Sequence, residues 1–224
     1  MLATRIIPTL LCRGRQLVKG KQFNAWRTCG LALQAARIHG MRGVDELVLL
    51  DIGATPEGRG PDLKLIEELS ESMHTPLAVG GGIRTITDVR AVLCAGADKV
   101  VIGMGAHSES TLISEAAKRF GRQAIVLAVD VQGGLVRGMG AGPKPSMWCS
   151  WLEHTGAGEI ILTSVDREGM MTGYDCETLK KVCSMVQIPV IAHGGAGTYQ
   201  HMVDAVHAGA SAVAAGSLFQ FTDA

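Results

Sequence analysis

Two stretches of this 224-residue sequence align without a gap at a constant offset of 113 residues. The matched positions are Pro76 with Pro189, Gly81 and Gly82 with Gly194 and Gly195, Thr85 with Thr198, Ala95–Ala97 with Ala208–Ala210, Val100 with Val213, Gly103 with Gly216, and Glu46 with Glu159. A single match of this kind is common among barrel folds, whereas a series of matches at one spacing indicates a duplicated half-chain. A duplication of this kind favours a closed barrel with pseudo-twofold symmetry.

Short apolar runs alternate with amphipathic segments along the chain, an order typical of a parallel sheet with helical crossovers. The expected strands are Arg5–Leu10, Glu46–Ile52, Pro76–Val79, Lys99–Ile102, Ile125–Val131, Glu159–Val165, Pro189–Ala192 and Ala212–Ala215. The expected helices are Leu31–His39, Leu63–Met73, Ile86–Ala95, Ser110–Phe120, Met147–His154, Glu177–Met185 and Tyr199–Ala208. This count predicts one (βα)8 TIM-barrel domain over residues 1–224. The alternative is an open doubly wound sheet, but the sequence lacks its Gly-rich N-terminal turn and ribose-binding acid.

Composition excludes several classes of protein. Hydrophobic residues make up 47% of the chain, and 21 Lys and Arg balance 21 Asp and Glu, so no charge footprint for nucleic acid or an anionic membrane is present. No apolar run approaches the roughly 20 residues of a membrane-spanning helix, and no signal-peptide pattern begins the sequence, so we expect a soluble cytoplasmic protein.

The cysteines give no sign of a metal site or a disulfide framework. They form no C-x-x-C pair and have no histidine partners at zinc spacing. We therefore expect all six to be reduced and structural: Cys12, Cys29, Cys94, Cys149, Cys176 and Cys183. No metal and no cofactor are expected.

Glycine clusters follow four of the expected strands, at Gly80–Arg84, Gly103–Gly105, His193–Gly197 and Gly216–Ser217. Glycines there let backbone N–H groups approach an oxyanion, and the next helix N-terminus adds a positive dipole. The pairing across the repeat predicts two phosphate sites, built from Gly81, Gly82 and Gly103 and from Gly194, Gly195, Gly216 and Ser217. The alternative explanation is that these glycines only allow the chain to turn after each strand.

A family resemblance covers the whole chain. It is carried by Arg5–Pro8, Val18–Gly20, Asp45–Asp51, Gly80–Arg84, Gly96–Lys99, Asp130, Gly156–Glu159, Thr163–Gly169, Gly173–Asp175 and Gly194–Gly197. In this order they resemble the HisF family, the cyclase subunit of imidazole glycerol phosphate synthase in histidine biosynthesis. The resemblance implies a lyase/cyclase that takes ammonia from a glutaminase (HisH-like) partner. Its substrate is a bisphosphorylated ribulosyl formimino carboxamide nucleotide.

The resemblance also implies roles for individual residues. The family uses an acid and a base at the ends of the first and fifth strands, and Asp130 matches one of them. Leu11 stands at the other position, and an aliphatic side chain cannot transfer a proton. Lys19 is the second catalytic residue that the resemblance implies. The substrate-site residues that it implies are Asp51, Thr163, Asp166 and Glu168.

Other residues at the same end of the barrel differ from the family. Gly103 replaces an asparagine of the first phosphate site, and Glu168 replaces an aspartate. His193 stands where the family often has serine. It can line the mouth or the phosphate side of the site. Because histidine ordinarily titrates near neutral pH, it can alternatively replace the missing acid. Asp130 alone could instead serve as a capping or loop-anchoring carboxylate.

Charged residues mark the opposite end of the barrel. Arg5, Glu46, Lys99 and Glu159 match the family's ring of charges through which ammonia enters. A salt-bridge plug that only stabilises the bottom of the barrel is the alternative. Asp45 and Asp98 match positions that the family uses near the glutaminase.

Three functions follow as hypotheses. The first is a cyclase that works with a substitute for the missing acid. The second is a non-cyclising ammonia conduit, as in a branch of the family encoded with surface-polysaccharide genes that supplies a sugar amidotransferase. The third is a phosphate-ligand-binding barrel without a glutaminase.

The end of the sequence differs from the family too. The family continues with a closing helix after the eighth strand, whereas here that helix is missing or truncated at Leu218–Ala224. We expect exposed apolar surface, and with it reduced stability or an altered oligomer.

Overall fold

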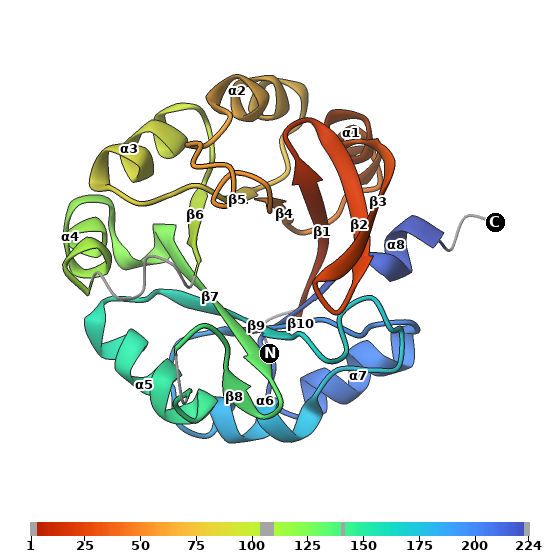
Figure 1. Ribbon diagram of the computed structural model, residues 1–224, viewed down its shortest axis with the longest axis vertical. Helices are drawn as coiled ribbons and strands as arrows, with labels where there is room; N and C mark the ends of the chain where they lie inside the picture. The colour runs from red at the N-terminus through yellow and green to blue at the C-terminus, as the bar shows by residue number, and fades with distance from the viewer. Residues whose placement is uncertain (1–3, 104–109, 140–141, 222–224) are drawn as a thin grey trace.

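Eight parallel strands form a closed ring in the computed structural model, which describes residues 4–103, 110–139 and 142–221 (Figure 1). In ring order they are β1 (Arg5–Arg13), β4 (Leu47–Asp51), β5 (Leu77–Gly80), β6 (Lys99–Ile102), β7 (Ile125–Gln132), β9 (Glu159–Ser164), β10 (Val190–His193) and β11 (Ala212–Ala215). β11 pairs in parallel with β1, from Arg5 opposite Ala212 to Pro8 opposite Ala215, and this pairing closes the ring. The predicted (βα)8 barrel is confirmed, and the open sheet is excluded.

Helices surround the ring of strands (Figure 1). They are α1 (Ala32–Met41), α2 (Leu63–Ser72), α3 (Ile86–Cys94), α4 (Ser110–Phe120), α5 (Pro145–Thr155), α6 (Cys176–Cys183), α7 (Tyr199–His207) and α8 (Ser217–Phe221), with a 3-10 turn, η2, at Arg122–Ala124. Their apolar faces cover the outside of the strands and form the larger of two buried clusters. None of the helices in the described part is both long and apolar enough to cross a membrane.

The inside of the barrel holds a second apolar cluster. Its members include Ile7, Val48, Val101 and Ile161. Each lies two residues after one of the four charged residues predicted at the barrel bottom. Because side chains of a strand alternate between its two faces, residues two apart share a face, so this cluster is the next layer above those charges.

The internal repeat is confirmed at the level of secondary structure. A shift of 113 residues carries β5, α3 and β6 onto β10, α7 and β11 with the same bounds. The helix caps repeat as well, since Thr85 and Thr198 cap α3 and α7, and Asp62 and Asp175 cap α2 and α6. The repeated residues therefore encode repeated local structure.

The two threonine caps allow a matched stability test. Thr85 belongs to a capping box in which the Asp88 side chain accepts from the Thr85 backbone N–H, whereas Thr198 only accepts from the His201 backbone N–H. Thr85→Ala is expected to lower the free energy of unfolding by about 1 kcal/mol. Thr198→Ala should cost less, because it disturbs one cap bond rather than a reciprocal pair. Urea unfolding of both variants checks this order, and equal costs would contradict it.

An antiparallel hairpin, which the sequence analysis did not predict, follows β1. β2 (Gln16–Lys21) pairs with the end of β1, and β3 (Asn24–Leu31) pairs with β2. β3 is exposed along nearly its whole length and therefore has no apolar alternation to indicate a strand. A second short strand, β8 (Leu135–Val136), pairs with the end of β7 in the same manner.

The short helix α8 follows the last strand of the ring. Its Leu218 is buried in the outer core. The ring of Phe219 packs edge-on against His39 of α1, with the centroids 6.0 Å apart. A helix is therefore present after the last strand, and it packs against α1 and the outer core.

Candidate active site

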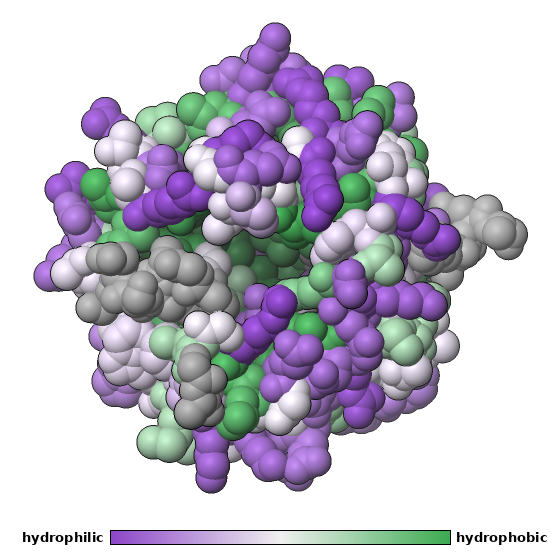
Figure 2. All heavy atoms as spheres, viewed as in Figure 1, coloured by the Kyte–Doolittle hydropathy of each residue, from purple (hydrophilic) through white to green (hydrophobic). Residues whose placement is uncertain are grey.

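The carboxyl ends of the strands surround a cavity of about 540 Å³. Figure 2 shows a hollow at the centre of the face viewed, with hydrophobic residues deep inside it. Val101 and Ile161 of the interior cluster line its inner end. Its walls carry the polar residues Arg13, Asp51, Arg84, Asp130, Arg137 and His193. A large cavity with converging polar groups at this end of a barrel is the usual position of an active site.

Leu11 and Asp130 face each other across this cavity. Both line it, and they lie on β1 and β7. The strands follow one another around the ring in the order β1-β4-β5-β6-β7, so β7 lies four strands from β1. In a barrel of eight strands this is the opposite wall. Leu11 is buried, and its aliphatic side chain carries no group that could transfer a proton.

The environment of Asp130 suits acid–base chemistry. Burial raises the pKa of its carboxyl to about 6, and the nearby Arg137 and a hydrogen bond from Thr163 oppose that shift only in part. A pKa near the working pH lets one group both take and give a proton. A carboxylate that only capped a helix or anchored a loop would be stabilised in its charged form, with a lowered pKa.

The raised pKa of Asp130 predicts a pH-dependent cost in stability. The folded chain holds this proton up to about pH 6, while the unfolded carboxyl releases it near 3.8. The group therefore stabilises the fold at low pH and loses that contribution as the pH rises through 6. Asp130→Asn should consequently be more stable than wild type above pH 7 by on the order of 2 kcal/mol, with the difference vanishing near pH 4. Chemical denaturation of both chains from pH 4 to 8 measures it; parallel curves would contradict it.

A smaller cavity of about 20 Å³ lies beside the large one. It is lined by Lys19, Glu168 and Ser217, and by the predicted phosphate-site glycines Gly194, Gly195 and Gly216. Burial lowers the pKa of Lys19 to about 8, although the Glu168 carboxylate opposes the shift. Thr9 also lines this cavity, and its hydroxyl is the one buried side-chain polar atom of the described residues without a hydrogen-bond partner.

The predicted phosphate-site glycines divide between the two cavities. Gly81, Gly82 and Gly103 line the large one, on the β5 and β6 side, and the other set lines the small one. Met104 and Gly105, which belong to the first predicted site, lie outside the described residues.

The conformations of two of these glycines also have a local cause. A Cβ on Gly81 would lie 2.4 Å from the Asp51 carbonyl oxygen, and a Cβ on Gly195 would lie 2.2 Å from that of Gly173. Both residues have a positive φ, +115° and +108°. Backbone packing therefore requires glycine at both positions, whether or not a phosphate binds there.

The predicted substrate residues are only partly brought together. Thr163 and Asp51 line the large cavity and Glu168 lines the small one. Asp51 accepts hydrogen bonds from Arg59, at 3.0 Å, and from the Gly53 backbone. Asp166 lines neither cavity; its carboxylate accepts from the Gly133 N–H at 2.7 Å, at the turn between β7 and β8.

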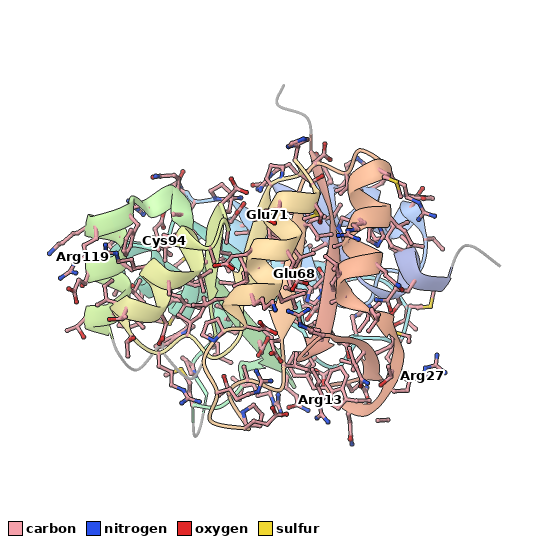
Figure 3. The ribbon with its side chains drawn as sticks, turned by 90° about the horizontal axis from the view of Figure 1, so that it is seen from above. Arg13, Arg27, Glu68, Glu71, Cys94 and Arg119 are labelled. Atoms are coloured by element: carbon pink, nitrogen blue, oxygen red, sulfur yellow. The ribbon has the colours of Figure 1, made fainter. Side chains whose placement is uncertain are left out.

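Several cavity residues were missed by the sequence analysis because they lie on the unpredicted hairpin or beside β8. Phe23 and Trp26 line the large cavity, and so does Arg137, whose guanidinium lies 5.3 Å from the centre of the Phe23 ring. Figure 3 shows Arg13 and Arg27 at the same end of the barrel, where the hairpin projects. Only recognition of the hairpin and of the β7–β8 turn could have assigned these side chains to the mouth.

The four charged residues at the other end form a closed ring. Each carboxylate binds both cations: Arg5 pairs with Glu46 and Glu159, and Lys99 lies 2.9 Å from Glu46 and 2.8 Å from Glu159. Both glutamates are buried, whereas the cations are partly exposed. The four residues thus encircle the barrel axis as predicted, and the interior apolar cluster separates them from the mouth cavity.

The two aspartates predicted near a partner lie just outside this ring. Both are exposed. Asp45 accepts from the Ile6 N–H and Asp98 from the Leu77 N–H, each at 2.8 Å. Each carboxylate therefore holds the beginning of a neighbouring strand and still presents charge on the bottom face.

No group of three or more His, Cys, Asp or Glu side chains that could hold a metal ion is found in the ranges that the structure describes. The six cysteines have free thiols. Burial raises the pKa of both Cys12 and Cys149 to about 12, so these two are poor nucleophiles at neutral pH.

Comparison with known proteins gives the same picture. The histidine biosynthesis protein family matches residues 5–224. Among curated relatives, the HisF subunit of imidazole glycerol phosphate synthase from Acidobacterium capsulatum is 45% identical, over 99% of this chain and 91% of its own length. The subunits of that name from Dictyoglomus thermophilum and Gluconacetobacter diazotrophicus are 42% and 39% identical, over 99% of this chain and 91% and 89% of their own lengths. With this similarity along the whole barrel, the chain belongs to the HisF family of histidine biosynthesis proteins.

Proposed function

We propose that this chain is the synthase subunit of an imidazole glycerol phosphate synthase type of complex. It takes ammonia at the bottom of the barrel and uses it on a bisphosphorylated, nucleotide-like substrate at the mouth. The observation that carries the proposal is the arrangement at the mouth: one predicted glycine set lines the large cavity that contains Asp130, and the other set lines the small cavity beside it. A substrate with a phosphate at each end fits such a pair of sites.

The interior of the barrel is suited to ammonia rather than ammonium. Ammonia released by a glutaminase would meet the ring of Arg5, Glu46, Lys99 and Glu159 and then the apolar cluster above it. A neutral molecule crosses an apolar layer at little cost, whereas a cation loses its hydration there. The exposed Asp45 and Asp98 beside the ring would contact the glutaminase.

The proposed reaction closes an imidazole ring and breaks a C–N bond. Protons must be taken from and given to opposite sides of the bound intermediate. Asp130 can serve one side. Leu11 cannot transfer a proton on the other side, so the chain would cyclise slowly unless another group replaces the acid. Loss of one partner of such a pair typically costs about 10²- to 10⁴-fold in rate.

The test is binding and turnover of the ribulosyl formimino carboxamide nucleotide. Calorimetry should detect binding, and competition by inorganic phosphate should weaken it. Consumption with an ammonium salt should be slow and should stop in Asp130→Asn, with binding retained. A wild-type chain that neither binds nor consumes the nucleotide would refute the proposal.

A second candidate is a non-cyclising ammonia conduit for a separate sugar amidotransferase. It is favoured by the contrast between an intact charge ring and a mouth in which Leu11 replaces the acid. A third, a phosphate-ligand-binding barrel, needs no glutaminase. Copurification with a HisH-like glutaminase, reduced by charge reversal at Asp98, would exclude the third. Nucleotide turnover by wild type would exclude the second.

A further inference from the structure

We propose that Asp130, Thr163 and His193 form a proton relay that does the work of the proton-transfer group missing at Leu11, with His193 as the base and Asp130 as the acid; the catalytic part of this inference depends on the proposed function. The three residues lie on three neighbouring strands in direct register. Asp130 of β7 is opposite Thr163 of β9, and Thr163 is opposite His193 of β10. The parallel pairing itself therefore sets the three side chains in a row around the mouth.

The geometry of this row admits one direction for a relay. The Thr163 hydroxyl oxygen lies 3.1 Å from Nδ1 of His193, and the strand register places Asp130 on the other side of Thr163. A threonine hydroxyl has a single proton, so a path that ends on the Asp130 carboxylate needs Thr163 to donate to Asp130 and to accept from Nδ1–H of His193. A neutral His193 in that tautomer keeps Nε2 as an acceptor. Burial and the nearby Lys19 lower the pKa of His193 to about 4, consistent with a neutral ring.

His193 also lies where the missing group is needed. Among the residues that the structure describes, Leu11 and His193 line both the large and the small cavity of the mouth. In the ring, β10 lies two steps from β1 and two steps from β7. The row thus carries a proton path from the wall of Asp130 a quarter of the way around the barrel, towards the wall of Leu11.

The transfer balances without any other reactant. Nε2 of His193 takes a proton from the bound intermediate, Nδ1 gives its proton to the Thr163 oxygen, and the Thr163 hydroxyl gives its proton to Asp130. The histidine ends in its other neutral tautomer, and the carboxylate ends as a carboxylic acid. Asp130 then returns that proton to the intermediate on its own side. One carboxylate and one imidazole therefore do the work of two carboxylates.

The test breaks the relay at two links and in two backgrounds. His193→Ser and Thr163→Val should each lower kcat for ammonium-dependent nucleotide turnover by about 10²- to 10⁴-fold, with little change in KM. The double variant should be no slower than the slower single variant, because both changes interrupt one path. In Leu11→Asp, which restores a carboxyl group, His193→Ser should cost less than about 10-fold. His154→Ser, an exposed histidine on α5, is the control for loss of an imidazole.

The possible results of these measurements distinguish the relay from a structural role of His193. If His193→Ser lowers kcat equally in the wild-type and Leu11→Asp backgrounds, His193 has a merely structural role and the relay is overturned. A wild type without turnover beside an active Leu11→Asp would also overturn it, while leaving the proposed substrate site standing. If both are inactive, the proposed function fails, and ¹⁵N NMR of the His193 ring decides the hydrogen-bonded row. An Nδ1–H tautomer that is lost in Thr163→Val supports the row, and an Nε2–H tautomer refutes it.

Discussion

In a His193→Ser background, where the proposed relay is broken, Leu11→Asp is expected to raise the rate of ammonium-dependent nucleotide consumption by about 10²- to 10⁴-fold. In the wild-type background, where the relay already transfers the proton, the gain should be less than about 10-fold. The substitution places a carboxyl group on β1, across the cavity from Asp130, so that the two walls of the mouth can exchange protons with opposite sides of the intermediate. Leu11 lies at the edge of the cavity and is 8% exposed, so the new carboxyl can contact ligand and water.

The measurement is kcat with saturating nucleotide and ammonium salt. Leu11→Asn is the matched control, because the asparagine side chain has the same shape as that of aspartate but cannot carry the proton. Leu11→Asp combined with Asp130→Asn should return the rate to a low value. Thermal unfolding of each variant guards against loss of the fold. A chain with both Leu11→Asp and His193→Ser that binds the nucleotide and is no faster than His193→Ser alone would show that the β1 position does not limit the reaction.

Glu46→Gln is expected to lower the free energy of unfolding by about 3 kcal/mol. Glu46 is 3% exposed and pairs with Arg5 and Lys99. When its charge is removed, Glu159 must balance both cations alone, and a partly buried positive charge is left without a partner. Breaking a buried ion pair by neutralising one member is costly because the other member has already lost its hydration.

Urea unfolding at neutral pH measures this cost. The exchanged pair, Glu46→Lys with Lys99→Glu, keeps the charges of the ring and should recover part of the loss relative to either single exchange. Asp98→Asn, which keeps an oxygen for the Leu77 N–H, is the control for removing a carboxylate at the same end of the barrel. A cost below about 1 kcal/mol for Glu46→Gln would mean that water screens the ring as it does a surface pair.

Much of the barrel could be predicted because its signals are local. A buried parallel strand is a short apolar run, and helix caps such as Thr85 and Thr198 are single residues. The hairpin at Gln16–Leu31 could not be predicted this way. β3 is nearly all exposed and is held by backbone pairing with β2 rather than by an apolar face, so nothing in its composition marks it as a strand.

The candidate site shows the same division. The family pattern assigned Asp130 and Lys19 to the mouth, and the position of the glycine clusters after the strands assigned the two phosphate-site sets to it. The cavities contain Asp130, Lys19 and the residues of both sets. The family pattern could not assign Phe23, Trp26 or Arg137, because these depend on the path of the hairpin and of the β7–β8 turn. It also gave Asp166 a place in the site, while the structure places its carboxylate on the backbone of that turn.

The sequence by itself determined the family, the eightfold alternation, the internal repeat and the absence of an acid at Leu11, because each is a matter of residue type and spacing along the chain. Only the tertiary structure decided that four distant charges close into one ring, that Leu11 opposes Asp130, and that Asp130, Thr163 and His193 stand in register. Those facts depend on ring closure and strand register, which arise when segments far apart in the chain pair through backbone hydrogen bonds. No local pattern encodes which residues that pairing brings face to face.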